Sequence, residues 1–272
     1  MLTASRALSL SSQSSPELPR VAALDDLYRM GVRPRQGEII MIAGRSGTQK
    51  SGFALWWVLN MGLPTLYFSA DMTPFQASVR IACSATNKTT EQVELGMADE
   101  AIAPAIRHAV DSVPITFSFG SPITWHAVDD ELTAFVELWN AYPAVIVIDN
   151  LMDIEGASAD YTAQMEAMQN IADLSRATGS TVLVLHHASD KSWEAKSDPW
   201  KPPSRDQVKG GMSEKPELSL SVALDPTSYI YRIACLKQRM GPSDPSAQTF
   251  ATLRADPART RFLPYEHGLT AI

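Results

Sequence analysis

Short apolar runs alternate with longer stretches of helical character along most of the chain. The apolar runs predict strands at residues 38–43, 65–69, 114–119, 144–148 and 181–185. The stretches between them predict helices near residues 51–61, 74–86, 97–111, 126–140 and 160–178. Strands that are apolar along their whole length and alternate with helices are typical of a parallel sheet covered on both faces. The pattern therefore predicts an α/β fold.

The signals at two helix ends agree with this assignment. Thr73 is a suitable N-cap, and Pro74 after it occupies the first helical position, where proline is favoured. Gly179 follows Arg176 and is a typical helix stop. These residues predict one helix that begins at Pro74 and another that ends just before Gly179.

The pattern changes after residue 186. Residues 188–217 are polar and rich in Pro, Lys and Ser, which predicts a long loop that is either functional or disordered. Shorter apolar runs follow, and they predict an antiparallel edge formed by strands at residues 218–224, 229–236, 249–253 and 260–263. Residues 1–20 are Ser-rich and interrupted by two prolines, which predicts a flexible N-terminal arm before one domain over residues 21–272.

Composition and charge narrow the class of protein. The chain has 272 residues, 45% hydrophobic and 19% charged, which suits one large α/β domain with a substantial core. Cys83 and Cys235 lie in apolar surroundings and indicate neither a disulfide framework nor a zinc site. No apolar run is long enough to span a bilayer, so we expect a cytoplasmic protein. The net charge of −7 argues against a generally basic surface for nucleic acid, but it is compatible with a local basic channel.

The segment between the first strand and the first helix has the pattern of a phosphate-binding loop. It consists of Gly44, Arg45, Ser46, Gly47, Thr48, Gln49, Lys50 and Ser51. In such a loop, backbone N–H groups and a helix N-terminus surround the phosphates, the lysine reaches the terminal ones, and the hydroxyl holds Mg²⁺. Gln49 departs from the pattern, because glycine usually precedes the lysine where the backbone approaches phosphate. A plain strand-to-helix turn is the alternative interpretation.

Two acidic residues follow predicted strands. Asp149 ends the run 144–148, at the position where phosphate-loop ATPases order Mg²⁺ and its water shell. Asp71 follows the run 65–69, and neighbouring strand ends of a parallel sheet face the same crevice. Asp71 is therefore a candidate for polarising an attacking water. Each acid could instead be an ordinary surface residue at a strand end.

Two further groups follow later strands. His186 and His187 end the run 181–185, where a side chain can hydrogen-bond a terminal phosphate; a structural pair or a metal site are the alternatives. Lys237 and Arg239 follow another strand, and residues two apart on a strand point to the same side. Such a pair suits an anion, and in a ring of subunits it can reach the neighbour's nucleotide as an arginine finger. A solvated edge is the alternative.

Together these motifs resemble the RecA-like motor domain of the DnaB-type replicative hexameric helicases, over roughly residues 24–265. The run Lys237-Gln238-Arg239-Met240-Gly241-Pro242 is the most specific part, because this family has a Lys-Gln-Arg-x-Gly-Pro run that supplies cations to the neighbouring subunit. The other matching pieces are Gly37-Glu38, the phosphate-binding loop, residues 67–72 with Arg80, Ile148-Asp149, Leu185-His186-His187 and Val208-Lys209-Gly210-Gly211.

The resemblance implies a fold and a role for individual residues. The fold is RecA-like, with an antiparallel C-terminal edge. Lys237 and Arg239 correspond to the trans-acting lysine and arginine finger, Asp71 to a catalytic glutamate that is one methylene longer, and His187 to the γ-phosphate sensor. Gln49 stands where the family has glycine. The family's N-terminal primase-docking domain has no counterpart here, so a phage- or plasmid-type single-domain relative is expected.

The resemblance also implies that loops after Asp149 and after His187 line a central pore and contact single-stranded DNA. The second loop interleaves basic residues with Trp193 and Trp200, which suits phosphates and stacked bases, although acidic residues bring its net charge close to zero. A solvated loop is the alternative. The candidate DNA-binding residues are Lys191, Lys196, Lys201, Arg205, Lys209, Gly210 and Gly211.

Three functions fit these observations. The first is an ATP- and Mg²⁺-dependent helicase or translocase that acts as a ring, expected to be a hexamer, on single-stranded DNA in replication. A replication loader is a further expected partner, and no membrane association is expected. The second is a RecA-like ATPase that serves as a switch or loader in phage or plasmid replication without unwinding. The third is a degenerate nucleotide-binding scaffold, which the departures at Gln49 and Asp71 keep open.

Overall fold

The computed structural model describes residues 15–189 and 200–265. Its strands are β1 (Ile39–Gly44), β2 (Thr65–Ser69), β3 (Ile115–Ser118), β4 (Val145–Asp149), β5 (Thr181–His187), β6 (Leu218–Asp225), β7 (Ile230–Gln238), β8 (Ala251–Asp256) and β9 (Arg261–Pro264). They form one sheet in the order β3-β2-β4-β5-β1-β6-β7-β8-β9. The pairs from β3 to β6 are parallel, and those from β6 to β9 are antiparallel. The predicted fold class, with its antiparallel edge, is confirmed.

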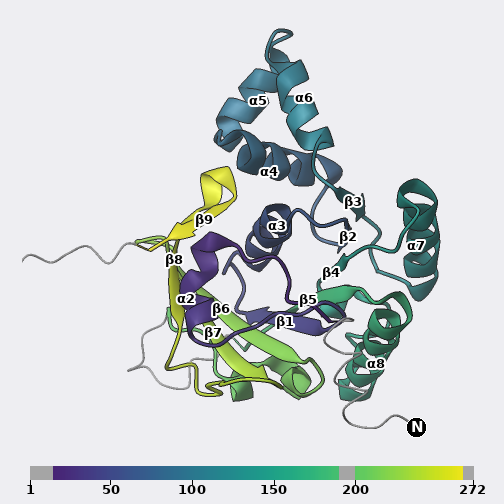
Figure 1. Ribbon diagram of the computed structural model, residues 1–272, viewed down its shortest axis with the longest axis vertical. Coiled ribbons are helices and arrows are strands. Elements are labelled where there is room, and N and C mark those ends of the chain that lie inside the picture. Colours follow the sequence, from purple (N-terminus) through teal and green to yellow (C-terminus); the bar gives the residue numbers. More distant parts are fainter. Residues whose placement is uncertain (1–14, 190–199, 266–272) are drawn as a thin grey trace, which may run out of the picture.

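The α-helices of the described residues lie on both faces of this sheet and beyond its end. They are α2 (Asp25–Arg29), α3 (Lys50–Met61), α4 (Pro74–Thr86), α5 (Thr90–Ala98), α6 (Ala103–Asp111), α7 (Trp125–Trp139) and α8 (Tyr161–Thr178). In Figure 1, α2 and α3 lie on one side of the sheet, α7 and α8 lie on the other, and α4–α6 project away from the body. Helices on both faces explain why the inner parallel strands β1, β2 and β4 are buried along their whole length.

Alternating residues of β1 enter two different cores. Ile40 and Ile42 pack with residues of α3 such as Phe53, whereas Met41 packs with residues of α7 and α8 such as Met168. Side chains alternate between the faces of a strand, so a strand between two helical layers needs apolar residues at every position. The continuous apolar runs in the sequence have this origin.

The prediction of one helix over residues 97–111 is wrong. The structure has two helices there, α5 and α6, because the chain leaves helical conformation at Asp99. Thr89 caps α5 in a capping box with Gln92, a Thr-x-x-Gln signal that is legible in the sequence. The helices pack closely: a Cβ on Gly96 would lie 2.7 Å from the Ile106 side chain.

The other helix-end predictions are confirmed. The Thr73 side chain accepts a hydrogen bond from the Gln76 amide, with Pro74 as the first helical residue. Gly179 ends α8 with a φ of +71°, a left-handed conformation that glycine adopts without steric cost. Both features are local, which is why the sequence alone locates them.

Residues 15–20 differ from the expected flexible arm. Backbone hydrogen bonds join Leu18 to Pro34 and Gln36 to Pro16, each at 2.9 Å, and the Leu18 side chain is buried. An apolar residue between the two prolines thus anchors this segment on the body. Residues 1–14 lie outside the described residues.

The described part of the predicted loop at 188–217 also has more structure than expected. Ala188 pairs with Val208, and 3-10 segments run from Arg205 to Gln207 and from Lys209 to Glu214. Val208 and Met212 are buried in the same core as residues of α8. These isolated apolar residues show no periodicity, so the pattern of the sequence carried no sign of their packing. Lys191 and Lys196 lie outside the described residues.

None of the helices in the described residues is long and apolar enough to cross a membrane.

Candidate active site

The phosphate-binding loop connects β1 to α3 and keeps the backbone path that its pattern requires. Gly47 has a φ of +75°, and Gln49, the residue before α3, has a φ of +57°. A left-handed conformation costs a residue with a side chain about 1–2 kcal/mol, whereas glycine adopts it freely. The loop therefore keeps the conformation that glycine would favour, although Gln49 occupies the position.

Lys50 begins α3 and is held within the loop. Its Nζ donates to the carbonyl oxygens of Gly44 at 3.2 Å and Arg45 at 3.0 Å, and the residue is largely buried. Thr48 Oγ1 also donates to the Arg45 carbonyl, at 2.8 Å. The loop thus places a cation and an α-helix N-terminus at the carboxyl end of β1, where anions bind favourably.

Ser51 and Asp149 lie together although they are far apart in the sequence. Ser51 Oγ donates to Asp149 Oδ1 at 3.1 Å, and Tyr67 Oη donates to Asp149 Oδ2 at 2.9 Å. Hydroxyl and carboxylate oxygens are the ligands that Mg²⁺ prefers, so Ser51 and Asp149 fit this ion. Burial raises the pKa of Asp149, and the hydrogen bonds from Ser51 and Tyr67 oppose that rise.

A cleft of about 320 Å³ gathers the predicted catalytic residues of the parallel strands. Ser69 of β2 pairs with Asp149 of β4, which places the following Asp71 at the same edge of the sheet. The residues that line the cleft are Ser46, Gly47, Thr48, Gln49, Lys50, Ser51, Gly52, Asp71, Met72, Gln76, Arg80, Asp149, Asn150 and His187. Lys50, Ser51, Asp71, Asp149 and His187 thus share one site.

The two histidines at the end of β5 face different surroundings. His187 lines the cleft, and burial lowers its pKa, with Lys50 and Lys209 lowering it further. His186 is fully buried, and its Nε2 lies 2.8 Å from the Lys209 carbonyl oxygen. Burial lowers the pKa of His186 to about 4, so it is neutral at pH 7 and donates this hydrogen bond. In the described residues, no cluster of potential ligands suits a metal site at this pair.

Lys237 and Arg239 lie outside this cleft. They lie on the opposite side of the sheet, where the parallel strands β1 and β6 begin. Lys237 donates to the carbonyl oxygens of Glu214 and Pro216, and Arg239 forms an ion pair with Glu217 at 3.4 Å. Glu217 also accepts from the backbone N–H of Ile39, the first residue of β1. Because β1 has six residues, its two ends are roughly 16 Å apart, which is too far for these cations to reach the cleft of their own chain.

Sequence reasoning gave no role to several residues of the site, among them Arg80 and Tyr67. Arg80, on α4, lines the cleft, and Tyr67, inside β2, holds the carboxylate of Asp149. A tyrosine inside an apolar strand gives no sign that its hydroxyl reaches the neighbouring strand's end. The resemblance included Arg80 together with residues 67–72, but assigned it no place in the cleft.

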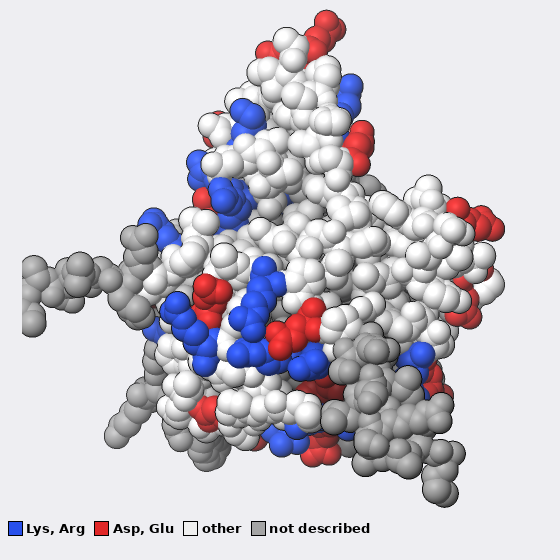
Figure 2. Space-filling model, in the orientation of Figure 1, with Lys and Arg blue, Asp and Glu red and all other residues white. Residues whose placement is uncertain are grey.

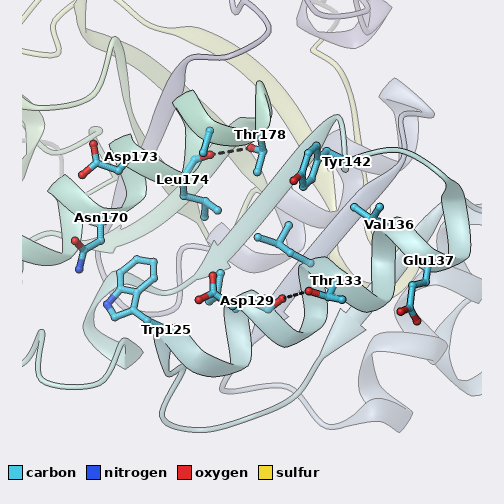
Figure 3. A pocket seen from close by; sticks show the side chains of 13 residues that line it. Trp125, Asp129, Thr133, Val136, Glu137, Tyr142, Asn170, Asp173, Leu174 and Thr178 are labelled. Atoms are coloured by element: carbon cyan, nitrogen blue, oxygen red, sulfur yellow. Dashed lines mark hydrogen bonds between the residues drawn. The ribbon is translucent and has the colours of Figure 1, made fainter.

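A larger hollow lies elsewhere, between α7 and α8. It has a volume of about 860 Å³, and Figure 3 shows Trp125, Leu174 and Tyr142 around it, with Asp129 and Asp173 at its rim. Its lining has no phosphate-binding loop, and it lies on one helical face instead of at the strand ends. The smaller cleft therefore remains the candidate active site, because it joins a cation, a hydroxyl and carboxylates.

Comparison with known proteins agrees with this geometry. A family model described as an AAA domain, AAA_25, matches residues 5–192. The chain belongs to this family. Two relatives of the AAA_25 chain are called gene 65 protein: that of Mycobacterium phage L5 is 29% identical over 93% of this chain and 95% of its own length, and that of Mycobacterium phage D29 is 27% identical over 79% and 94%.

Solved structures show what fold this AAA_25 chain has. One solved ATPase domain superposes with a TM-score of 0.77, at 14% identity and 96% coverage of both chains. A DnaB-like replicative helicase, studied with its interactions with primase, superposes with a TM-score of 0.76 at 15% identity; the match covers 92% of this chain and 63% of that one. The predicted resemblance to the motor domain of DnaB-type helicases is confirmed as a shared fold.

Proposed function

We propose that the chain is an ATP-dependent DNA helicase or translocase that acts as a ring on single-stranded DNA in replication. One observation carries the proposal. A cleft at the carboxyl ends of the parallel strands is shared by Lys50, Ser51, Asp71 and Asp149, whereas Lys237 and Arg239 lie where those strands begin. The fold shared with a solved ATPase domain and with a DnaB-like replicative helicase supports it.

Nucleotide binding is assigned to the loop of residues 44–51. Lys50 and the backbone N–H groups at the start of α3 bind the phosphates of ATP, and Ser51 and Asp149 hold Mg²⁺. When bound, Mg²⁺ neutralises the charge that develops on the phosphates. Tyr67 keeps one oxygen of Asp149 fixed, which orients the carboxylate toward Ser51.

Hydrolysis is assigned to the polar groups around the rest of the cleft. Asp71 orients and polarises the attacking water, and His187 contacts the terminal phosphate. Burial lowers the pKa of His187, which favours the neutral imidazole in the ligand-free cleft, and its ring N–H can donate a hydrogen bond. The side chain of Asp71 is one methylene shorter than that of glutamate, so its carboxylate extends less far toward the water that it polarises.

The missing cations come from a second copy of the chain. Arg239 has 61% of its side chain exposed, and its ion-pair partner among the described residues is Glu217, which it can exchange for a phosphate at a subunit junction. Burial lowers the pKa of Lys237, and Arg239 lowers it further. A junction that joins the cleft of one copy to the cations of the next is a head-to-tail contact, which forms a ring when the rotation closes; we propose a hexameric ring.

Single-stranded DNA is assigned to the segment after β5. Lys209, Gly210 and Gly211 are exposed, and Lys201 and Arg205 are half-buried at the same segment; Lys191 and Lys196 are included in the proposal. The Lys209 carbonyl is bound by His186, which lies next to His187 in the chain, so this segment is linked to the cleft. On the face that Figure 2 draws, acidic and basic side chains are interleaved over α2, so DNA contact is assigned to the segment after β5 and not to that surface.

The test is the ATPase rate with and without single-stranded DNA. We expect single-stranded DNA to stimulate the rate strongly in the natural chain, and we expect Lys50→Ala to lose the activity. Arg29→Ala, on the exposed face of α2, is the control: purified in the same way, it should keep the activity. A slow rate without DNA stimulation would indicate a switch or loader, and no rate would indicate a nucleotide-binding scaffold. Mass measurement with an ATP analogue and an oligonucleotide reports ring size. The phage origin of the relatives supports action in an infected bacterial cell. We also propose a replication loader as a partner.

A further inference from the structure

Gln49 places an unused amide in the cleft. The side chain is half-buried and lines the cleft beside Lys50, Ser51 and Asp71. Within residues 15–189 and 200–265, the amide has no hydrogen-bond partner. Because an amide offers two N–H donors and one acceptor, its hydrogen-bonding capacity is available to a molecule in the cleft.

The backbone at Gln49 is strained for a residue with a side chain. Its φ of +57° lies in the left-handed region, which glycine adopts without cost. The backbone conformation at this position therefore favours glycine over glutamine. Backbone strain at a ligand-binding loop is commonly retained where it serves the ligand.

Gly52 makes room for this side chain. Gly52 lies on the first turn of α3, where glycine is unfavourable compared with alanine. A Cβ at Gly52 would lie 2.9 Å from Gln49 Oε1, closer than real Cβ contacts allow. The glutamine before the lysine and the glycine after Ser51 are therefore sterically coupled.

We infer that the Gln49 side chain donates a hydrogen bond to the terminal phosphoryl group of the bound nucleotide, and that Gly52 preserves the space it needs. The inference rests on the proposed ATP-dependent function. The amide adds a neutral donor to the backbone N–H groups of the loop, next to the Lys50 ammonium. It favours a nucleoside triphosphate over the diphosphate, because the diphosphate lacks the group that Gln49 contacts.

Calorimetry on Gln49→Gly tests this contact. We expect the affinity for a Mg²⁺-bound non-hydrolysable ATP analogue to fall about 10-fold, the scale of a lost hydrogen bond to a charged group. The affinity for Mg²⁺-ADP should stay within about twofold, because that ligand never makes the contact. Gln49→Glu, which has the same length but a negative charge, should weaken the analogue more than Gln49→Gly does.

A double-mutant cycle tests the role of Gly52. Gly52→Ala should weaken analogue binding in the natural chain, because the added methyl displaces the Gln49 side chain. In the Gln49→Gly background the same change should have no further effect, since the side chain that it would displace is gone. Both changes favour the backbone, so thermal unfolding should show that the variants stay folded.

The outcomes separate this inference from the proposed function. If the natural chain binds neither the ATP analogue nor ADP, the proposed function fails and the inference with it. If the natural chain binds both and Gln49→Gly keeps the affinity for the analogue, only the inference is overturned. Equal losses from Gly52→Ala in the two backgrounds would overturn the role of Gly52.

Discussion

The parallel and antiparallel parts of the sheet carry complementary parts of the proposed site. In the parallel part, the carboxyl ends of β1, β2, β4 and β5 lie on the same side of the sheet. The phosphate-binding loop and the acids that follow these strands form the cleft there. In the antiparallel part, β7 runs in the opposite direction to β6. Its carboxyl end therefore places Lys237 and Arg239 on the side of the sheet where β1 begins. The direction of one strand therefore separates the cations from the cleft of their own chain, and for this reason the proposed mechanism takes them from a neighbouring copy.

The largest expected effect breaks the contribution of the antiparallel part. Arg239→Ala should lower the rate of ATP hydrolysis about 10³-fold, because an arginine finger stabilises charge in the transition state, and should leave nucleotide affinity nearly unchanged. Steady-state ATPase assays and calorimetry measure the two quantities.

The control for this change is Arg254→Ala, an exposed arginine on the neighbouring strand β8. Mixing Arg239→Ala subunits with Lys50→Ala subunits should restore part of the rate, since some junctions then join an intact loop to an intact arginine. Verified mixed rings without any restored activity would contradict the trans role.

A slightly smaller effect is expected within the parallel part. Asp149→Asn should lower hydrolysis about 10²-fold, because the amide binds Mg²⁺ poorly. Burial raises the pKa of Asp149, so loss of this charge should not lower the melting temperature without ligand. Asp173→Asn, an exposed change on α8, is the matched control. Normal hydrolysis by Asp149→Asn would contradict the proposed role of Asp149 in holding Mg²⁺.

A pair of tyrosines compares the two parts directly. Tyr67→Phe removes a hydrogen bond to Asp149, so the pKa of Asp149 should rise and the acidic limb of the ATPase pH profile should move to higher pH. Half-saturation by Mg²⁺ should require about 10-fold more ion.

Tyr231→Phe in β7 is the matched change, because the buried Tyr231 hydroxyl has no partner among the described residues. It should leave the pH profile unchanged and raise the free energy of unfolding by about 1 kcal/mol. The same pH shift in both variants would contradict a specific role for Tyr67.

The smallest effect at neutral pH concerns His186. Burial lowers the pKa of His186 in the folded chain from 6.5 to about 4, so between these values the unfolded state binds more protons. Stability should therefore be complete above pH 6.5 and should decline as the pH falls toward 4, by up to about 1.4 kcal/mol per pH unit from this group.

His186→Gln keeps a donor for the Lys209 carbonyl but does not titrate, so it should reduce the pH dependence and leave unfolding at about pH 7.5 little changed. Urea unfolding at several pH values measures the difference. Parallel curves for the two proteins would show that His186 does not cause the decline.

Several features could be predicted from the sequence because their causes are local. The apolar runs located the parallel strands, since burial on both faces requires apolar residues throughout a strand. Thr73 and Gly179 located helix ends, since a cap acts within a few residues. The Thr89 cap of α5 is equally local, whereas the single helix predicted over residues 97–111 was wrong because the chain leaves helical conformation at Asp99.

Other features depend on packing between distant segments. Val208 and Met212 anchor part of the segment at 188–217 through contacts with the core, so the described part of this predicted loop has more structure than its sequence pattern indicated. The Tyr67 hydrogen bond and the place of Arg80 in the cleft also depend on which strands and helices are neighbours.

The sequence by itself determined the α/β class, the position of the phosphate-binding loop and the identity of the groups at the strand ends. Only the tertiary structure decided that Ser51, Asp71 and Asp149 meet in one cleft. It also decided that Lys237 and Arg239 lie on the other side of the sheet, where the parallel strands begin. The physical reason is that a side chain's chemistry is a property of its residue, whereas its partners depend on the order and direction of the strands. That order results from packing the whole chain.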